Sequence, residues 1–493
     1  LTQGATHTLT LTKIGSGTQR LAGVSTYSGP TSLRGGALVV AATGALGTGD
    51  VTITGSAQRL TLTNNATITN SIVIDAPTGA AGNGVIHYEG TGRGTLATGT
   101  ITISANTLTS GIFGSSGGGE LVVDSPLVTL GSSRVSIRTG TVTLGGGGSY
   151  GGLDVAAGTL RVGRDGGIAS TAGIVLGTVA AATFDLAGFS QTVTGVVQGS
   201  AAAVIGNSST ARDATLRVTG TATYAGTLQD AVSGGTRRLH LAVDGGSFAL
   251  TAANTFSGST TLRSGTLSVR HPQALASSPV AVQTGGVLRV DGAFAMQSAG
   301  LAIAGGRVDL DAGRIDIAAG GMDQESLVAA LLVGRGDGSW NGATGIGSAA
   351  ASAAVASGVS RTVGWMANAD GSLRVSFTAA GDTNLDGIVD VLDAATILSA
   401  GVFNTGEAAV WSQGDFTYDG VVDVLDAAAM LGSGLFDAGP FMTTGLSGLA
   451  PVAAVPEPGT SALVIALAIG VVRAASRSRR SDRRVAGSRR RSV

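Results

Sequence analysis

Short alternating runs separated by glycine fill residues 1–320 and restrict the folds open to this chain. In segments such as 8–12, 51–54 and 141–144, Thr alternates with Val, Leu or Ile. This period of two is typical of β-strands, and the Gly, Ser, Asn and Asp between the runs are typical of turns. Each pair of strands is too small to bury its own apolar face, so neighbouring pairs must stack to make a core.

A longer repeat runs through the same region. Residues 26–40 align with residues 255–269, and a degenerate copy occupies residues 150–162. The shared form is an aromatic residue followed by Ser-Gly-x-Thr-x-Leu and then Gly-x-Leu-x-Val, which resembles the autotransporter-associated β-strand repeat of bacterial passenger domains. The resemblance implies a right-handed parallel β-helix with roughly 20–25 residues per turn and on the order of fifteen turns. A β-sandwich or a propeller remains an alternative, whereas a hydrophobic content of 43% argues against disorder.

Two twelve-residue segments, which begin at Asp382 and Asp415, carry the spacing of a calcium-binding loop. Such a loop uses side-chain oxygens at positions 1, 3, 5, 9 and 12 and the carbonyl of position 7, with Gly at position 6 for the sharp turn. From residue 381 to residue 440 there are ten acidic residues and no Lys or Arg, so the segment repels itself without cations. The predicted Ca²⁺ ligands are Asp382, Asn384, Asp386, the carbonyl of Ile388, Asp390 and Asp393 in the first loop, and Asp415, Thr417, Asp419, the carbonyl of Val421, Asp423 and Asp426 in the second.

The paired loops, with Asp at position 12 and a short apolar run after each (394–400 and 427–432), resemble a type I dockerin. The resemblance implies a small α-helical module that docks onto a cohesin-like or other surface protein through residues 381–440. Loop positions 10 and 11 are Val-Leu in both copies, so we expect an apolar recognition surface. Thr417 at position 3 offers a weaker ligand than Asn384, and we expect the second site to be looser.

Residues 321–380 have the features of a cap for the last turn of a solenoid. Asp323 can N-cap a short helix, and strands are expected around residues 362–365 and 373–377. The order Gly-x-Trp-Asn-Gly, Val-Gly-Trp and then the first loop is similar to the C-terminal part of large repeat proteins from planctomycete-type bacteria. The helix residues expected on one buried face are Leu327, Val328, Leu331 and Leu332.

The last 40 residues resemble a PEP-CTERM sorting signal. Pro456-Glu457-Pro458 precedes an apolar run at 461–472, and nine Arg follow between residues 473 and 491. The resemblance implies a transmembrane helix at 459–472 and cleavage near Pro456-Glu457-Pro458 by an exosortase-type enzyme, with a plain uncleaved anchor as the alternative. We also expect a signal peptide ahead of Leu1.

Composition and motifs then narrow the function. The chain has no Cys, which suits an extracellular bacterial protein that folds without disulfides. Its net charge is −1 and it has no basic stripe with stacking aromatics, which argues against nucleic-acid binding. Ser116 matches a nucleophile-elbow pattern but sits in a Gly/Ser run without a following helix, and the four His are scattered. Carboxylates that could pair along one face of a β-helix, as at lyase and hydrolase sites, are Asp154, Asp185, Asp244, Asp309, Asp311 and Asp316.

We therefore expect a non-catalytic, secreted protein of the cell surface or extracellular matrix, transiently or permanently anchored by its C-terminus. The alternative is an extracellular polysaccharide lyase or hydrolase on the same β-helix, tethered through the dockerin-like module. The expected organisation is a β-helical body at 1–320, a cap at 321–380, a calcium module at 381–440, a linker at 441–454 and a sorting segment at 455–493.

Overall fold

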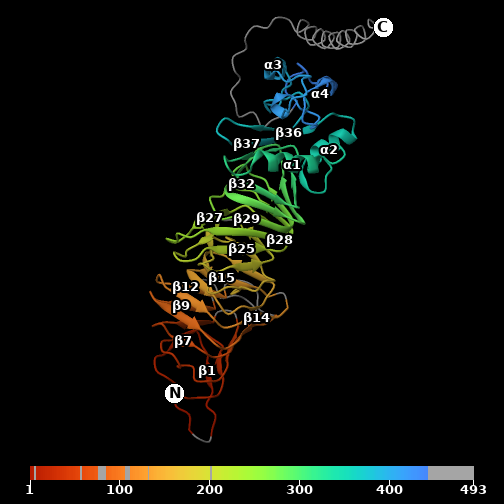
Figure 1. Cartoon of the computed structure of the whole chain (residues 1–493). Coiled ribbons are helices and arrows are strands. Elements are labelled where there is room, and N and C mark those ends of the chain that lie inside the picture. The colour runs from red at the N-terminus through yellow and green to blue at the C-terminus, as the bar shows by residue number, and fades with distance from the viewer. Residues whose placement is uncertain are drawn as a thin grey trace, which may run out of the picture. The chain divides into compact units, whose positions relative to one another are not determined.

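The computed structural model of this chain describes residues 1–4, 7–55, 58–75, 85–105, 112–131, 133–199 and 202–441. The chain divides into two compact units, Leu1–Phe377 and a second that starts at Thr378 (Figure 1). The predicted linker and sorting segment lie almost wholly outside the described residues. Among the described residues, no helix is both long enough and apolar enough to cross a membrane.

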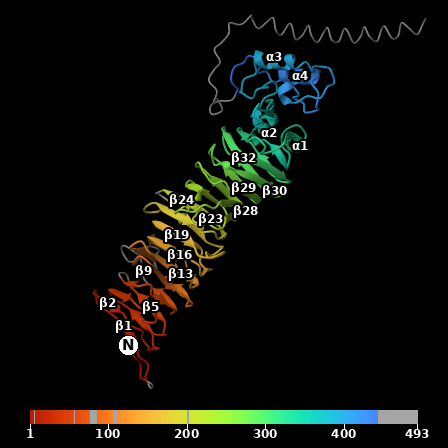
Figure 2. The ribbon, with the colours of Figure 1, turned by 60° about the vertical axis from the view of Figure 1, so that its left-hand side comes forward.

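The first unit is a parallel β-solenoid of about 14 turns. Strands stack turn upon turn in Figures 1 and 2, and among the described residues the strands before the cap pair in parallel, for example β3 with β5 and β13 with β16. Parallel stacking excludes the sandwich and propeller alternatives, because both of those are antiparallel folds. The expectation of on the order of fifteen turns is confirmed.

Three parallel sheets form the first half of the solenoid, and between residues 51 and 162 each turn contributes one strand to each sheet in sequence order. The first sheet contains β1 (Leu11–Lys13), β3 (Thr31–Leu33), β5 (Val51–Thr54), β8 (Ile72–Asp75), β11 (Ile101–Ile103), β14 (Leu127–Thr129) and β17 (Gly148–Ser149). The second contains β2 (Thr18–Leu21), β4 (Ala37–Val40), β6 (Arg59–Leu62), β9 (Ile86–Glu89), β12 (Phe113–Ser116), β15 (Val135–Thr139), β18 (Gly152–Val155), β20 (Gly173–Leu176) and β23 (Gly195–Gln198). The third contains β7 (Thr67–Ile68), β10 (Arg93–Leu96), β13 (Glu120–Val123), β16 (Thr141–Leu144), β19 (Gly158–Val162), β21 (Ala182–Asp185), β24 (Ala203–Asn207) and β27 (Thr227–Ala231).

In the second half of the solenoid the strands are longer and bent, so that one strand pairs with two different strands of the preceding turn. Strand β28 pairs with β25 through residues 239–243 and with β26 through residues 248–250. The strands of this fourth sheet are β22 (Gln191–Val193), β25 (Ala214–Val218), β26 (Ala222–Tyr224), β28 (Leu239–Leu250), β29 (Thr260–Val269), β30 (Leu275–Gln283), β31 (Gly286–Val290), β32 (Ala295–Ala304), β33 (Arg307–Asp309) and β34 (Arg314–Ile317), followed by the cap strands β35, β37 and β36.

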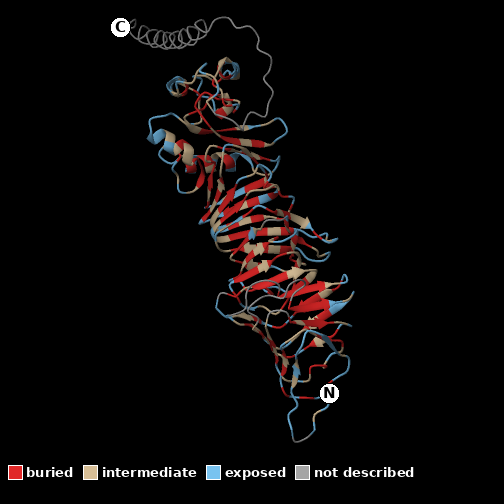
Figure 3. Cartoon of the chain, turned by 180° about the vertical axis from the view of Figure 1, so that it is seen from behind, coloured by how far each residue is buried: buried red, intermediate tan, exposed pale blue. Residues whose placement is uncertain are grey.

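The core is a set of columns in which one inward side chain per turn stacks on its register partner. One column on the third sheet is fully buried, and Figure 3 shows such buried positions along the strands while exposed residues gather in the loops. Burying a side chain of this size contributes roughly 1.5–3 kcal/mol, so each turn is stabilised mainly by its neighbours. The members of that column are Leu121, Val142, Leu160, Phe184, Ile205 and Leu228.

The first half of the repeat motif is explained by packing inside a turn. Its aromatic position is buried in all three copies, as Tyr27, Tyr150 and Phe256. In the two full copies the Gly two residues later faces the backbone of the preceding turn, since a Cβ on Gly29 or Gly258 would lie 2.4 or 2.0 Å from a carbonyl oxygen. A larger residue there would push two turns apart.

The second half of the motif begins with a glycine that has a positive φ. Gly36, Gly158 and Gly265 have φ of 62°, 84° and 75°, a region that residues with a Cβ rarely adopt. A Cβ on Gly158 would also lie 2.3 Å from the carbonyl oxygen of Gly140, its counterpart one turn earlier. Glycine is thus required twice at this corner, for its dihedral angle and for the close approach of stacked turns.

The cap begins with helix α1 (Gln324–Arg335), whose N-cap Asp323 accepts the backbone N–H of Ser326 at 2.7 Å, as predicted. Leu327 and Leu331 are fully buried, but the assignment of Leu332 to the same face was wrong, because it is 46% exposed. Residues 331 and 332 lie about 100° apart around a helix, and the buried row continues to Gly334 instead. Val328 is half-buried.

Parallel stacking continues past residue 320, because β35 (Gly345–Gly347) pairs with β33. Helix α2 (Ala349–Ala356) and the strands β36 (Thr362–Ala367) and β37 (Leu373–Thr378) follow, and the two strands lie where strands were expected. Strand β37 pairs antiparallel with β34. This reversal of direction ends the solenoid with strands that belong to the cap.

The second unit contains α3 (Val391–Ala400), a 3₁₀ turn η1 (Trp411–Gln413) and α4 (Val424–Gly432). Both helices follow a predicted calcium loop, and each begins three residues earlier than the apolar run suggested. The reason is that the last loop residues, 391–393 and 424–426, already form the first helical turn.

Candidate metal centre

Each predicted loop folds onto the start of its exit helix through its last carboxylates. Asp390 and Asp423, at loop position 9, are the N-caps of α3 and α4, and each accepts a backbone N–H two residues ahead at 2.7 Å. Asp393 and Asp426, at position 12, complete capping boxes by accepting the N–H of the N-cap residue at 3.0 and 2.9 Å. A capping box satisfies two backbone donors that the helix leaves free, so both loop ends are held in one orientation.

In the first loop, hydrogen bonds already satisfy both carboxylate oxygens of Asp382. Its Oδ1 accepts the N–H of Asp386 at 3.1 Å, and its Oδ2 accepts the N–H of Gly387 at 3.1 Å. The hydroxyl of Thr378 also donates to Oδ2, at 2.5 Å. At position 3, the Asn384 side-chain amide donates to the Asp386 carboxylate at 2.9 Å. The side chains at positions 3 and 5 are thus hydrogen-bonded to each other.

The second loop differs, because two buried oxygens have no hydrogen-bond partner among the described residues. These atoms are Oδ1 of Asp415, a residue only 6% exposed, and Oγ1 of Thr417. They stand at loop positions 1 and 3, which supply cation ligands in a calcium loop. Burying an oxygen acceptor without a partner costs free energy, so this pair fits a hard cation.

Burial and like charge raise the carboxyl pKa values at position 1 of both loops. Burial raises the pKa of Asp382 to about 7 against the opposing effect of the Thr378 hydrogen bond, and the charges of Asp393 and Asp386 raise it further. Burial raises the pKa of Asp415 to about 6, with added repulsion from Asp426 and Asp419. Burial also raises the pKa of Asp393 to about 6. In each loop the carboxylates at positions 5 and 12 thus act as like charges on the carboxylate at position 1.

Among the described residues, no three His, Cys, Asp or Glu side chains already form a group that could hold a metal ion. A calcium loop completes its ligand set with a backbone carbonyl and with amide or hydroxyl oxygens, and its carboxylates repel one another until the cation is bound. The loop backbone supports this chemistry, since Gly387 and Gly420 at position 6 both have φ of 86°. The residues present fit Ca²⁺ bound by oxygen.

The exit helices carry the same unpartnered apolar stripe, as the Val-Leu pairs at positions 10 and 11 predict. The residues at positions 10 and 11, and seven residues beyond position 10, lie on one face of each helix. Within the described part of the module, these side chains are largely exposed to solvent. Its most exposed members are Leu392 and Leu398 on α3, at 60% and 52%, and Val424, Leu425 and Leu431 on α4, at 55%, 58% and 56%.

Trp411 lies between the loops, and the loop pattern gave no reason to single it out. Its indole Nε1–H donates to the carbonyl oxygen of Asp382 at 2.9 Å, and its ring packs edge-on against Phe416 with centroids 4.9 Å apart. The residue is 1% exposed. A buried Trp ordinarily pairs its N–H, but the sequence does not say with which group.

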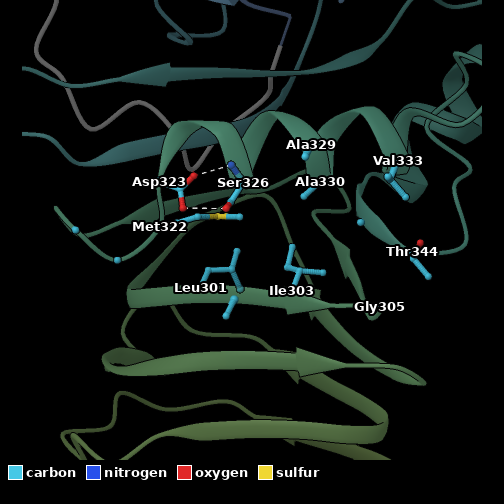
Figure 4. A pocket seen from close by; sticks show the side chains of 14 residues that line it. Leu301, Ile303, Gly305, Met322, Asp323, Ser326, Ala329, Ala330, Val333 and Thr344 are labelled. Carbon is cyan, nitrogen blue, oxygen red and sulfur yellow. Dashed lines mark hydrogen bonds between the residues drawn. The ribbon is translucent and has the colours of Figure 1, made fainter.

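In the first unit, a groove of about 850 Å³ lies between β32 and α1 (Figure 4). Its walls are apolar, with Leu301 and Ile303 on the strand facing Ala330 and Val333 on the helix. Asp323 is the single charged residue among the described residues that line it, and its carboxylate already accepts the N–H and the hydroxyl of Ser326. This groove therefore offers an apolar surface rather than acid–base chemistry.

The carboxylates of the solenoid mostly pair with Arg and not with one another. Asp185 is fully buried and accepts Arg161 Nε at 2.9 Å. Burial raises the pKa of Asp311 against the opposing charge of Arg289, and the charges of Asp309 and Asp291 raise it further. Further pairs are Asp244 with Arg217, Asp309 with Arg307, Asp311 with Arg289, and Asp316 with Arg314 and Arg374, while Asp154 accepts the hydroxyl of Thr178.

Ser116 does not sit on a nucleophile elbow. It ends strand β12 and a short turn leads into β13, so no helix follows it. Its hydroxyl lies 2.9 Å from His87 Nε2 on the adjacent strand of the preceding turn. The sharp strand-to-helix turn that exposes a nucleophile is missing from this part of the described structure.

The comparison with protein families finds one match, the passenger-associated-transport-repeat family, at residues 11–40, 139–162 and 243–269. These segments contain the three copies recognised in the sequence. The solenoid carries passenger-associated-transport repeats. Together with the fold, the repeats fit an autotransporter-associated repeat protein and indicate a passenger-type, surface or extracellular protein with a structural or adhesive role. Comparisons with curated proteins and with solved structures found no match.

Proposed function

We propose that this chain is a secreted cell-surface or matrix protein in which a β-solenoid spacer carries a calcium-stabilised docking module. The observation that carries the calcium assignment is the pair of buried, unpartnered oxygens, Asp415 Oδ1 and Thr417 Oγ1, at two ligand positions of the second loop. About 14 turns at the 4.8 Å spacing of β-strands make a spacer of about 65 Å. Extracellular calcium is sufficient to fill sites of even millimolar affinity.

In this proposal Ca²⁺ supplies the positive charge that the acidic module lacks. Asp382, Asn384, Asp386, Asp390 and Asp393, with the carbonyl of Ile388, would hold the first ion. The second would be held by the corresponding residues that begin at Asp415, with Thr417 making it the weaker site. The capping boxes keep the position-12 carboxylates at the helix starts, so filling the loops would also tighten α3 and α4.

The docking surface would be the apolar stripe on α3 and α4. Leu392 and Leu425, at loop position 11, are 60% and 58% exposed on helices related by the internal repeat. A stripe of this kind suits a partner with an apolar docking face, such as a cohesin-like or other surface protein. Replacing both Leu by Ser would then weaken capture of that partner and leave calcium binding unchanged.

Residues 455–493, outside the described residues, would be the sorting signal. An exosortase-type enzyme would cut near Pro456-Glu457-Pro458 after residues 459–472 had held the chain in the membrane. Intact mass measured on protein released from the native host tests this point. A species ending near residue 456 supports cleavage, whereas a membrane-bound full-length chain supports a permanent anchor.

The deciding experiment is a calcium titration of the full chain by calorimetry, with thermal unfolding measured in parallel. We expect two bound ions, each of which stabilises the second unit by about 2.7 kcal/mol when free calcium is one hundred times the Kd of its site. Asp415→Asn should remove one ion. Asp437→Asn makes the same charge change in the same module outside the loops, so it should retain both. Absence of binding up to about 5 mM calcium, beyond the usual range for extracellular modules, would refute the assignment.

One observation favours the alternative of a polysaccharide lyase or hydrolase. Arg289 on β31 lies 3.9 Å from the carboxylate of Asp291 and 4.0 Å from that of Asp311, which follows β33. Arg270, just after β29, pairs with Asp291 at 2.6 Å. Such a ladder could bind an acidic polysaccharide. Incubating the protein with acidic and neutral polysaccharides, while following bound protein and released sugar ends, separates the classes, because released ends mean catalysis and binding alone means adhesion.

A further inference from the structure

The two halves of the calcium module hold each other through reciprocal backbone contacts. After α3, the N–H of Asn404 donates to the carbonyl of Val422 in the second loop at 2.7 Å. After α4, the N–H of Asp437 donates to the carbonyl of Val389 in the first loop at 2.8 Å. Donors and acceptors match under the internal repeat, and both acceptors are at loop position 8. Each loop therefore accepts a backbone hydrogen bond from the segment that follows the helix of the other loop. We call this pair of contacts the clasp.

A further contact in each clasp reaches the turn of the loop. Ala409 N–H donates to the carbonyl of Gly420 at 2.9 Å, and Phe441 N–H donates to the carbonyl of Gly387 at 3.1 Å. Both acceptors are the glycine at position 6, beside the carbonyl ligand at position 7. Any adjustment of one loop around a cation thus acts directly on the segment that follows the other loop.

Trp411 joins the two loops through its side chain. Its Nε1–H binds the carbonyl of Asp382, at position 1 of the first loop, at 2.9 Å. Its ring contacts Phe416 and Tyr418, at positions 2 and 4 of the second loop, with centroids 4.9 and 5.7 Å away. Phe416 is tied to the ligand set in turn, because its N–H donates to Asp426 Oδ1 at 2.8 Å.

We propose that the loops bind calcium as one cooperative pair and that Trp411 is the positioning residue that couples them. This inference rests on the proposed calcium function. A cation in the second loop draws Asp415, Asp419 and Asp426 together and orders residues 416–418, on which the indole packs. The ordered indole holds the Asp382 carbonyl, so the first loop loses less conformational freedom when its own cation arrives. Coupling between sites in proteins typically changes affinity 5–150-fold.

Calorimetric calcium titrations of the full chain, of two Trp variants, and of two loop-disabling double variants made in each of these three backgrounds measure this coupling. Asp415→Asn with Asp419→Asn disables the second loop, and Asp382→Asn with Asp386→Asn disables the first. The coupling factor is the overall association constant of the unmodified chain divided by the product of the two single-loop constants. Trp411→Phe keeps an aromatic ring but removes the N–H donor. Trp365→Phe makes the same change at a buried Trp of the first unit and is the matched control.

We expect a coupling factor of at least 5 in the unmodified chain and with Trp365→Phe, and a value near 1 with Trp411→Phe. A factor near 1 in the unmodified chain overturns the proposal, as does a factor that survives Trp411→Phe. A chain that binds no calcium refutes the proposed function itself, which distinguishes the two failures.

If a double variant does not fold, Thr417→Val replaces it, because that hydroxyl makes no hydrogen bond within the described structure. Coupling then requires Thr417→Val to weaken both binding steps, and loss in one step alone counts against it.

Discussion

A three-variant series at the nearby glycines 151, 158 and 166 tests the claim that stacked turns require glycine for two separate reasons. Gly158 has φ of 84°, and a Cβ there would lie 2.3 Å from the Gly140 carbonyl oxygen. Gly166 has φ of 66° but nothing within 4 Å of an added Cβ, and Gly151 has neither constraint. Gly166→Ala measures the cost of the dihedral angle alone, and Gly158→Ala measures that cost together with the clash. Gly151→Ala measures the effect of adding a methyl group where neither constraint applies.

The magnitudes follow from these differences. Left-handed backbone costs a residue with a Cβ about 1–2 kcal/mol, and overpacking against fixed neighbours costs about 1–3 kcal/mol more. The Cβ added at position 158 would also disturb the Gly140 carbonyl oxygen as a hydrogen-bond acceptor, since this oxygen accepts the Thr159 N–H at 2.8 Å. We expect losses of about 3 kcal/mol for Gly158→Ala and about 1 kcal/mol for Gly166→Ala. Gly151→Ala should be neutral or slightly stabilising, because Ala restricts the unfolded chain.

Native-state hydrogen exchange of peptides that cover β16–β20 is the appropriate assay, because the stability of a solenoid is local. A loss of 3 kcal/mol corresponds to exchange about 100-fold faster, at 1.36 kcal/mol for each factor of ten. Equal effects of Gly158→Ala and Gly166→Ala would refute the close-approach argument. Protection lost equally in all three variants would refute both arguments.

Three further predictions concern a buried ion pair, a buried hydroxyl and pH. Arg161→Met should cost about 3 kcal/mol, since it leaves the fully buried carboxylate of Asp185 without its cation; local hydrogen exchange measures this, and an unchanged rate would contradict it. Tyr27→Phe should cost about 1 kcal/mol by removing the 2.7 Å contact with Thr31 Oγ1, and Thr31→Val should then add little in the double variant. Metal-free protein should lose stability in its second unit as pH rises from about 4 to 7, because the folded pKa values of Asp382 (about 7) and Asp415 (about 6) exceed the unfolded value near 3.8, so the folded state holds more protons in that window. Thermal unfolding in chelator measures this slope, and a stability that rises over that range would count against it.

The sequence predicts the periodic parts of the fold well. Gly-punctuated alternation indicates stacked strands, and the three aligned copies coincide with the three family matches. Local chemistry also predicts the N-cap at Asp323 and the helices after the loops, because a cap depends on a few adjacent residues. Prediction was weaker where two neighbours compete for one face, as with Leu331 and Leu332, since packing against segments distant in sequence, such as β35, selects the buried row.

Side-chain pairs between residues distant in sequence could not be predicted. Of the carboxylates considered for catalysis, Asp185, Asp244 and Asp311 meet Arg on the preceding turn, and that pairing depends on strand register. Register places Asp185 beside Arg161, 24 residues earlier in the chain. A shift by one residue would turn these side chains to the opposite face, so composition and local pattern cannot supply the answer.

The sequence by itself determined the repeating strands, the glycine corners and the two ligand-spaced loops, because each depends on residues that are neighbours along the chain. Only the tertiary structure decided which acidic oxygens lack partners, how each loop is clasped by the other half of its module, and where the Trp411 indole binds. These features depend on packing between distant segments, in which burial decides whether a polar atom must find a partner and geometry decides which one it finds.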